Sequence, residues 1–99
     1  MSGPSAFAVT ILDNRWRPRR ILPVRHHWTA VLPDLVVGGH HWIALIQRRP
    51  PHQAASPGPD DITLTRAIIR SVRPLDLRVA DHLIAAGDQW FSFRAAGLL

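Results

Sequence analysis

Residues 56–86, "SPGPDDITLTRAIIRSVRPLDLRVADHLIAA", decide the fold, because they predict a helix followed by a strand. Gly58 fits the N-cap of this helix, and Pro59 fits its first position. Asp60 and Asp61 then fall in the first turn, where a negative charge favours the positive end of the helix dipole. A helix beginning at residue 59 is therefore expected.

The body of this helix carries a broad apolar stripe at helical spacing. Its members are Ile62, Leu64, Ile68, Ile69, Val72 and Leu75. The helix should end near residue 73, before Pro74, because the residue before a proline disfavours helical geometry. Residues 76–86 predict a strand, 87–89 a turn and 90–94 the second strand of a C-terminal β-hairpin.

Upstream of this stretch the pattern predicts short strands and one short helical segment. "AFAVTILD" (6–13) is apolar on both alternating faces, which indicates a central strand. The other expected elements are an edge strand at 20–25, a strand at 27–33, one or two helical turns in 33–39 closed by Gly38-Gly39, and a buried strand at 41–48. The order predicts an α/β fold: one domain at 6–99 with a mixed sheet, after a flexible N-terminus at 1–5.

Composition limits the class of protein. The chain has 99 residues, 46% of them apolar, which is enough for one folded domain. It has no cysteine, so neither a disulfide framework nor a thiolate metal site is possible. No apolar run reaches membrane-spanning length, and no leader is evident at the start. We expect a cytoplasmic protein that does not contact a membrane.

The charged residues are of two types only. All 12 basic residues are arginine and all seven acids are aspartate, giving a net charge of +5. A mechanism that needs a glutamate base or ligand therefore has no candidate in this chain. The positive charge favours polyanionic partners such as nucleic acid.

Residues 56–99 resemble the C-terminal half of the RadC-like branch of the JAB/MPN family. The shared elements are Asp61-Ile62, Leu64-Thr65, Leu77-Arg78, Asp81-His82, the segment 91–94 and Gly97-Leu98-Leu99. "FAVTILD" (7–13) is similar to the family's first strand, whereas the resemblance is weak over 14–42, where a helix is shortened. The resemblance implies a JAB/MPN-like (cytidine-deaminase-like) zinc metalloprotease fold. We expect the helix-hairpin-helix segment usually placed before this domain to be absent.

The family's zinc site uses a Glu on the first strand, H-x-H-P-S-G at a strand end, and S-x-x-D opening a helix. Registering the chain from Pro57 and Asp61 carries these positions over residue by residue. The two His fall at Arg48 and Pro50, the motif Ser at His52, the helix-cap Ser at Gly58 and the Glu at Ser5. Asp61 is the one ligand retained.

A single aspartate does not hold zinc tightly, because zinc needs about three protein ligands and an open position for water. We therefore expect no catalytic residue, no bound cofactor and a binding or interaction role with an unknown protein partner. A metal-dependent isopeptidase or peptidase with an unrecognised site is the alternative enzyme. His26-His27 and His40-His41 do not favour it, because neighbouring strand residues point to opposite faces.

Arg48 stands at a ligand position, so its guanidinium is expected to fill the metal site and pair with Asp61. The competing interpretation makes Asp61 an ordinary first-turn acid that caps its own helix. His82 beside Asp81 is interpreted as a feature of the fold, and the four Trp as core or interface residues.

Residues 14–28, "NRWRPRRILPVRHHW", suggest a second function. Arginine interleaved with tryptophan suits phosphate contact and base stacking, although a solvated basic hairpin would have the same composition. RadC-like proteins carry a DNA-repair label, so the alternative function is a nucleic-acid-binding protein linked to DNA repair. Its candidate binding residues are Arg15, Arg17, Arg19, Arg20 and Arg25.

Overall fold

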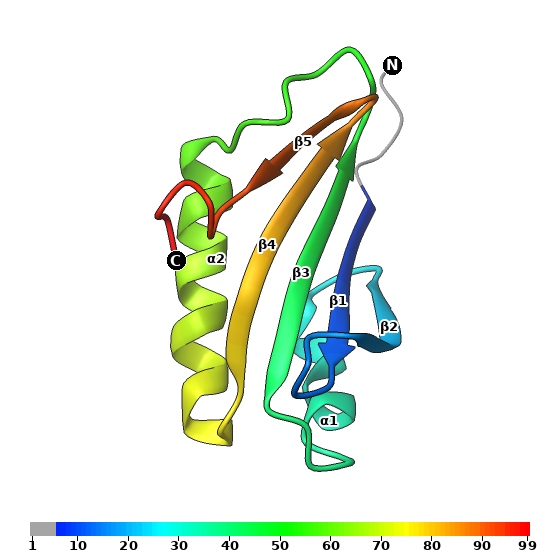
Figure 1. The fold of residues 1–99 in the computed structure, drawn as a ribbon, viewed down its shortest axis with the longest axis vertical. Helices are drawn as coiled ribbons and strands as arrows, with labels where there is room; N and C mark the ends of the chain where they lie inside the picture. Colours follow the sequence, from blue (N-terminus) through cyan, green and yellow to red (C-terminus); the bar gives the residue numbers. More distant parts are fainter. Residues whose placement is uncertain (1–5) are drawn as a thin grey trace.

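The computed structural model describes residues 6–99, and the expected N-terminal end at 1–5 and Ser5 lie outside them. The domain is a mixed five-stranded sheet with its helices beside it (Figure 1). The strands are β1 (Ala6–Leu12), β2 (Pro18–Val24), β3 (Trp42–Arg49), β4 (Arg78–Ala86) and β5 (Gln89–Ser92). The helices are α1 (Leu32–Leu35) and α2 (Pro59–Val72), with 3-10 turns at Trp28–Val31 and Arg73–Leu75. The predicted α/β class and mixed sheet are confirmed.

The strand order is β2-β1-β3-β4-β5, which places β1 inside the sheet and β2 at an edge, as predicted. The pairs β1–β2, β1–β3 and β4–β5 are antiparallel, and β3–β4 is parallel. Parallel neighbours need a crossover connection, and α2 supplies it here. The first turn of α2 consequently comes close to the end of β3.

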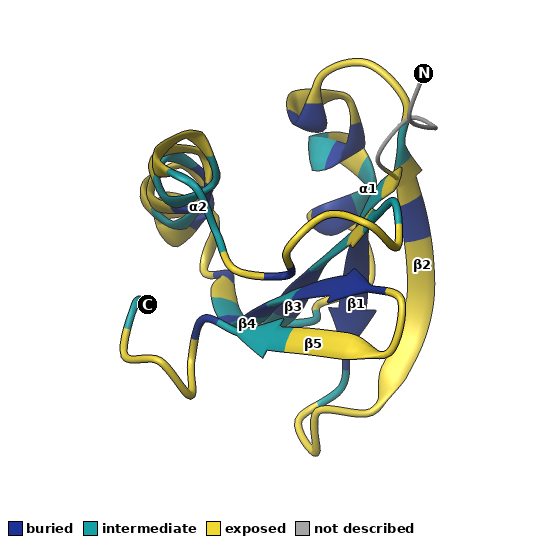
Figure 2. Cartoon of the chain, turned by 90° about the horizontal axis from the view of Figure 1, so that it is seen from above, coloured by how far each residue is buried: buried dark blue, intermediate teal, exposed yellow. Residues whose placement is uncertain are grey.

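The two faces of the sheet have different surroundings. Both helices lie on the same side of the strands (Figure 2), and we call this side the helical face. The main core packs there between the sheet and the helical segments. It consists of Val9, Ile11, Leu22, Ile43, Leu45, Ile68, Val72, Leu77, Trp28, Val31 and Leu35. We call the other side the open face, because neither α1 nor α2 packs on it.

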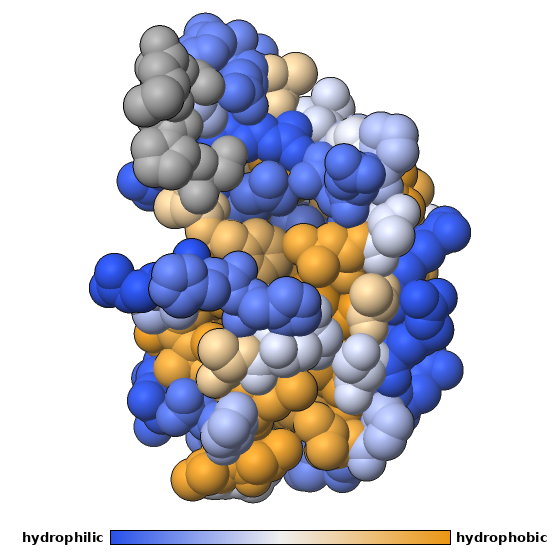
Figure 3. Space-filling model, turned by 180° about the vertical axis from the view of Figure 1, so that it is seen from behind, coloured by the Kyte–Doolittle hydropathy of each residue, from blue (hydrophilic) through white to orange (hydrophobic). Residues whose placement is uncertain are grey.

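Apolar side chains also reach the surface on the helical side. Seen from behind, hydrophobic residues spread across the middle and lower part of the molecule (Figure 3). Val36 and Val37, which follow α1, are 54% and 69% exposed, and Leu64 of α2 is 36% exposed. The short α1 thus leaves apolar surface uncovered on this side.

The strand predicted at 27–33 is wrong. This segment forms the 3-10 turn and the start of α1, and the His27 side chain accepts a hydrogen bond from the Thr29 N–H at its start. Trp28 and Val31, three residues apart, are both buried against the sheet, which a strand with alternating faces cannot achieve. The helical turns expected over 33–39 are present, although they begin at Leu32.

The predicted start and end of the main helix are confirmed, but its buried stripe is narrower than expected. Leu64 and Leu75 are exposed, while Thr65, Ile68 and Val72 are fully buried. Spacings of three and four residues put these three on one line of the helix surface. One line of buried side chains is enough to pack a helix against a sheet. The apolar stripe in the sequence is therefore wider than the surface that α2 buries.

Thr10 of β1 generates a prediction about stability. Its side chain is 2% exposed, and within residues 6–99 its Oγ1 finds no hydrogen-bond partner. Thr10→Val removes this hydroxyl and keeps the shape, so it should raise the free energy of unfolding by about 1 kcal/mol. Urea denaturation measures the change, with Thr63→Val on the exposed side of α2 as the control. A loss of stability in Thr10→Val would contradict the prediction.

Candidate functional site: the end of strand β3 and the first turn of α2

Asp61, in the first turn of α2, is the centre of the candidate site. Its carboxylate accepts hydrogen bonds from the Gly58 backbone N–H at 2.7 Å and from Gln47 Nε2 at 3.4 Å. It also forms an ion pair with Arg49 through Nη2. The Arg49 and Asp61 side chains are 12% and 19% exposed, so this pair is shielded from most of the solvent.

Arg49 also holds the loop that leads from β3 to α2. Its Nη1 donates to the carbonyl oxygens of Ala54 at 3.0 Å and Ser56 at 2.6 Å. One guanidinium therefore binds one carboxylate and two carbonyl groups. These are the kinds of oxygen ligand that hard metal ions take, and a planar cation now binds them.

The predicted Arg48–Asp61 pair is wrong, and the alternation of strand side chains gives the reason. Gln47 and Arg49 are two residues apart, so both point to the helical face, where Asp61 lies. Arg48 points to the open face and is exposed. Asp61 is paired with an arginine, as expected, but with the next one along the chain. It also accepts from Gly58, so the competing capping role holds as well.

The same alternation shifts the register of the metal motif. Two histidines in H-x-H face one side of a strand, and the two β3 side chains facing Asp61 are Gln47 and Arg49. Pro50 directly follows Arg49, just as the motif proline directly follows the second histidine. Counting back from Asp61 along the loop between β3 and α2 gives Arg48 and Pro50, one residue later than the two side chains that bond to Asp61. The geometry therefore favours a register in which Gln47 and Arg49 take these positions.

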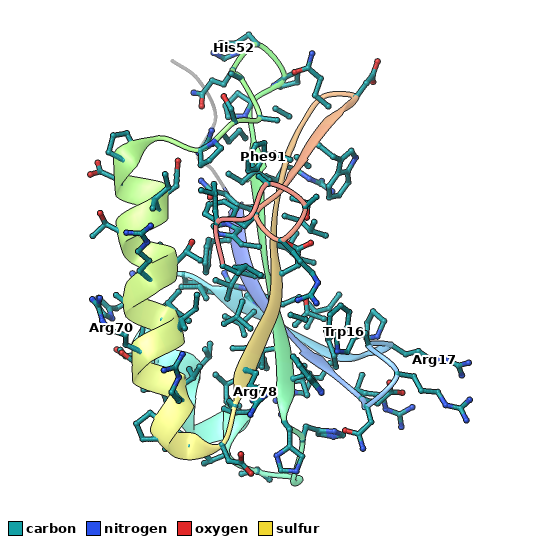
Figure 4. The ribbon with its side chains drawn as sticks, turned by 60° about the vertical axis from the view of Figure 1, so that its left-hand side comes forward. Trp16, Arg17, His52, Arg70, Arg78 and Phe91 are labelled. Atoms are coloured by element: carbon teal, nitrogen blue, oxygen red, sulfur yellow. The ribbon has the colours of Figure 1, made fainter. Side chains whose placement is uncertain are left out.

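The other predicted motif positions are in the surrounding loop. Gly58 is the N-cap of α2, as predicted. His52 is exposed and lines a hollow of about 600 Å³ between the loop and the β4–β5 turn. At the top of Figure 4 the label of His52 marks the tip of this loop, above the start of α2.

The charge of Asp61 is stabilised in the folded protein. Partial burial raises the pKa of its carboxyl, but the Gly58 N–H, Arg49 and Gln47 together lower it below its ordinary value of 3.8. An acid with a depressed pKa stabilises the fold above its unfolded pKa, and the contribution is lost as the pH falls through the folded value. The site is therefore a fixed ion pair at neutral pH.

Behind Asp61 lies a buried polar pair that the sequence alone did not identify. Thr65 Oγ1 donates to the Asp61 carbonyl oxygen at 2.8 Å and lies 2.6 Å from His82 Nδ1. Because the hydroxyl proton goes to the carbonyl, His82 Nδ1 carries the proton of the second bond. His82 Nε2 is then the bare nitrogen, and it has no partner among the described residues.

His82 is fully buried between aromatic rings. Its ring stacks on Phe93 at 4.3 Å and meets the edge of Phe7 at 5.9 Å. Burial lowers its pKa to about 4, despite the opposing effect of the Asp61 and Asp81 charges. Neutral His82 is thus part of the core, which agrees with the interpretation of His82 as a feature of the fold.

Asp81 points to the other face and closes the hairpin. Its carboxylate accepts from the His82 N–H at 2.7 Å, Ser92 Oγ at 2.6 Å and the Arg94 N–H at 3.0 Å. These bonds tie β4 to the segment after β5. Asp81 and His82 therefore do not form a catalytic pair.

The arginines predicted to bind nucleic acid do not all face the same side of the sheet. Arg20 pairs with Asp34 of α1 at 3.5 Å, so it faces the helical side. Arg17 projects to the side of the sheet away from α2, near Trp16 (Figure 4). Arg15 and Arg19 are exposed in the β1–β2 hairpin, and Arg25 is exposed directly after β2.

The histidine pairs are separate from the site. His27 caps its own 3-10 turn, and His41 Nδ1 lies 3.2 Å from Asp76 Oδ2, just before β4. Across residues 6–99, no three histidine or aspartate side chains are grouped closely enough to hold a metal ion. None of the helices in this part of the chain is long and apolar enough to span a membrane.

Comparisons with known proteins agree with this architecture. Residues 34–98 match the family described as RadC-like JAB domain. UPF0758 protein YkfG of Escherichia coli K12 is 30% identical over 93 residues, which cover 94% of this chain and 52% of YkfG. UPF0758 protein YeeS of the same organism is 30% identical over 101 residues, covering all of this chain and 60% of YeeS. A UPF0758 protein of Chloroflexus aggregans is 42% identical over 48 residues, 48% of this chain and 21% of its own length. The chain thus spans at most about 60% of these relatives.

The Arg49–Asp61 pair predicts that the adjacent residues Arg48 and Arg49 contribute differently to the stability of the fold. Arg49→Ala leaves the largely buried Asp61 carboxylate without its cation and frees two loop carbonyls, so it should cost roughly 2 kcal/mol of unfolding free energy. Arg48→Ala is the matched control, and as an exposed residue it should change stability by less than about 0.5 kcal/mol. The double variant Arg49→Ala/Asp61→Asn should lose less than the sum of the two single variants. Equal losses at Arg48 and Arg49, measured by urea denaturation, would contradict the pairing.

His82 predicts a loss of stability in mild acid. Its folded pKa of about 4 lies below the ordinary value of 6.5, so the unfolded chain binds the proton more readily. Stability is then fully present above pH 6.5 and falls by up to about 1.4 kcal/mol per pH unit as the pH drops toward 4. His82→Phe should flatten this slope, whereas His52→Ala, in an exposed loop, should leave it unchanged. Unfolding curves at several pH values test this, and equal slopes in wild type and His82→Phe would contradict it.

Proposed function

This chain belongs to the RadC-like JAB domain family, and from that premise we propose that it acts by binding, with an arginine closing the place where relatives of this fold hold zinc. The proposal makes it a non-catalytic interaction module that works in the cytoplasm.

One observation carries the proposal, namely the Arg49–Asp61 ion pair at the end of β3. A guanidinium does not deprotonate and cannot donate electrons to a metal. Its positive charge beside the retained Asp61 also repels a cation. Gln47, the other side chain aimed at Asp61, offers only a weak amide oxygen, so three good zinc ligands are not available together.

The lack of a candidate general base at this site is a second reason to favour a binding function. The chain contains no glutamate, and the expected position of the family's Glu falls on Ser5. Asp13, which follows β1, is at the wrong end of the sheet: Leu12 pairs with Trp42 at the start of β3, whereas Ala6 pairs with Arg48 at its end. No carboxylate in the described part of β1 can therefore take the proton of a metal-bound water at this site.

A protein partner is supported by the exposed apolar side chains on the helical side, above all Val36 and Val37. Nucleic acid is the second candidate, and a different observation favours it: the Arg94 guanidinium lies 4.8 Å above the ring of exposed Trp16. A hydrolase with some other arrangement of ligands remains the third possibility, which metal analysis tests directly.

Metal analysis of the purified protein tests the proposal. Wild-type protein should contain far less than one zinc per chain and show no metal-dependent peptidase or isopeptidase activity. The double variant Gln47→His/Arg49→His should gain about one zinc per chain, because it rebuilds H-x-H opposite Asp61. Its matched control, Arg48→His/Pro50→His, should remain without zinc.

Two outcomes separate the parts of this proposal. Stoichiometric zinc in the wild-type protein would refute the loss of the metal site. Zinc binding by the Arg48→His/Pro50→His variant, and not by the other, would refute the register in which Gln47 and Arg49 face Asp61.

A further inference from the structure

The open face of the sheet is an extended surface with large apolar side chains. Strand pairing places Ile21 of β2 opposite Thr10, which pairs in turn with Ala44 of β3. Ile46 of β3 pairs with Leu83 of β4 in the neighbouring row. Ile21 is 61% exposed although it lies on a folded sheet. This face therefore presents Ile21 and, in part, Ile46 and Leu83 to solvent, whereas the small Thr10 and Ala44 beside them are buried.

Tryptophan residues stand at both ends of this face. Trp42 begins β3 on the open side, and Trp16 from the β1–β2 hairpin meets its ring at 5.2 Å. Trp90 of β5 pairs with Ala85, on the opposite side from Ile84 and Phe91, which are in a core cluster. It is 61% exposed. Arg48, Ala85 and Trp90 lie in one row across β3, β4 and β5. The distance along β3 from Trp42 to this row is six residues, or about 20 Å at 3.3 Å per residue.

Trp16 has an unusual backbone conformation. Its φ is 62°, in the left-handed region, where a bulky residue is a genuine outlier. Glycine would occupy this turn position without a steric penalty. A tryptophan held there, 38% exposed, costs stability locally, and its ring covers Trp42 instead. This observation favours a function for the indole ring.

Arginine side chains border the tryptophans on this face. Arg94 lies over the Trp16 ring, and Arg17 projects on the same side of the sheet (Figure 4). Arg48 pairs with Ala85 on the open face, near Trp90, and is exposed. Asp81 also lies on this face, but its carboxylate accepts three hydrogen bonds from the chain itself. The free charges along the surface are thus mainly positive.

We propose that the open face of the sheet binds single-stranded nucleic acid, with bases stacking on Trp16 and Trp90 and phosphates contacting Arg17, Arg48 and Arg94. Exposed aromatic rings on a sheet that faces solvent, with guanidinium groups beside them, suit this ligand because every base offers a π-face. In a duplex the base faces are already stacked, so duplex binds more weakly. The site is separate from Asp61 and does not depend on the absence of zinc.

Charge argues against a second copy of the chain on this face. Two copies packed face to face would bring the surfaces carrying Arg17, Arg48 and Arg94 together, while the Asp81 carboxylate of this face is already engaged in three hydrogen bonds within its own chain. A protein partner would have to be acidic. Phosphates provide the negative charge at regular spacing, and the net charge of +5 adds to the attraction.

Fluorescence anisotropy with a labelled oligothymidine of about 12 nucleotides tests the proposal, at low salt and over a salt series. We expect the single strand to bind, a duplex of equal length to bind at least about tenfold more weakly, and the affinity to fall steeply with salt. Intrinsic tryptophan fluorescence should be quenched on binding. Absence of binding to any of these oligonucleotides at low salt would overturn the proposal, whatever the zinc content.

The variants separate stacking from general attraction. Trp16→Gly removes the ring and relieves the strained turn, and Trp90→Ala removes an exposed ring. Each should weaken binding about tenfold or more. Val37→Ala, an exposed apolar residue on the helical side, is the matched control and should bind as wild type does. If Trp16→Gly and Trp90→Ala bind as wild type while remaining folded, the stacking platform is refuted.

The arginines have their own control. Arg17→Ala/Arg94→Ala should weaken binding and reduce the slope of log affinity against log salt by about 1.4. Arg66→Ala/Arg70→Ala, on the exposed side of α2, removes the same charge and should have a smaller effect. Equal effects of the two pairs would show only general attraction to a basic protein and overturn the site. A dimer in light scattering that Trp90→Ala dissociates would assign the open face to a second copy instead.

Discussion

Parallel pairing of β3 with β4 is the constraint on which the rest of the molecule depends. Two parallel strands cannot be joined by a tight turn, so the chain must cross over, and it does so through α2. The crossover covers one face of the sheet and leaves the other uncovered. It also brings the first turn of α2 to the end of β3. The Asp61 site and the open face are both consequences of this one connection.

The Arg49–Asp61 pair shows how a partly buried carboxylate can stay charged. A carboxylate at the start of a helix is stabilised by the helix dipole and by the Gly58 N–H, but partial burial still disfavours its charge. The neighbouring Arg49 guanidinium offsets this effect and stabilises the charged carboxylate. Arg49 also binds the carbonyl groups of Ala54 and Ser56, so it orders the loop as a bound cation would. An exposed ion pair contributes only about 0 to 1 kcal/mol, and the larger effect here comes from partial burial and from the loop contacts.

The two faces of the sheet provide different surfaces for partners. The helical side has the core, the buried His82–Thr65 pair and the exposed valines after α1. The open side has tryptophan and arginine side chains with no helix over them. The two faces can therefore offer separate binding surfaces, and our proposals assign a different class of partner to each.

The sequence by itself determined the family and most of the elements in their order. Gly58, Pro59 and the acids after them fixed the start of α2 through local capping and dipole effects, and Pro74 fixed its end, because these act within a few residues. Apolar alternation identified the strands for the same reason. Only the tertiary structure decided which arginine meets Asp61: adjacent residues of a strand face opposite sides, so a loop longer by one residue exchanges Arg48 for Arg49. It also decided that residues 27–33 form helical turns and not a strand, because Trp28 and Val31 are buried against the sheet. Finally, it decided that Trp16, Trp42 and Trp90 share one face, because strand pairing joins residues that are far apart in the chain.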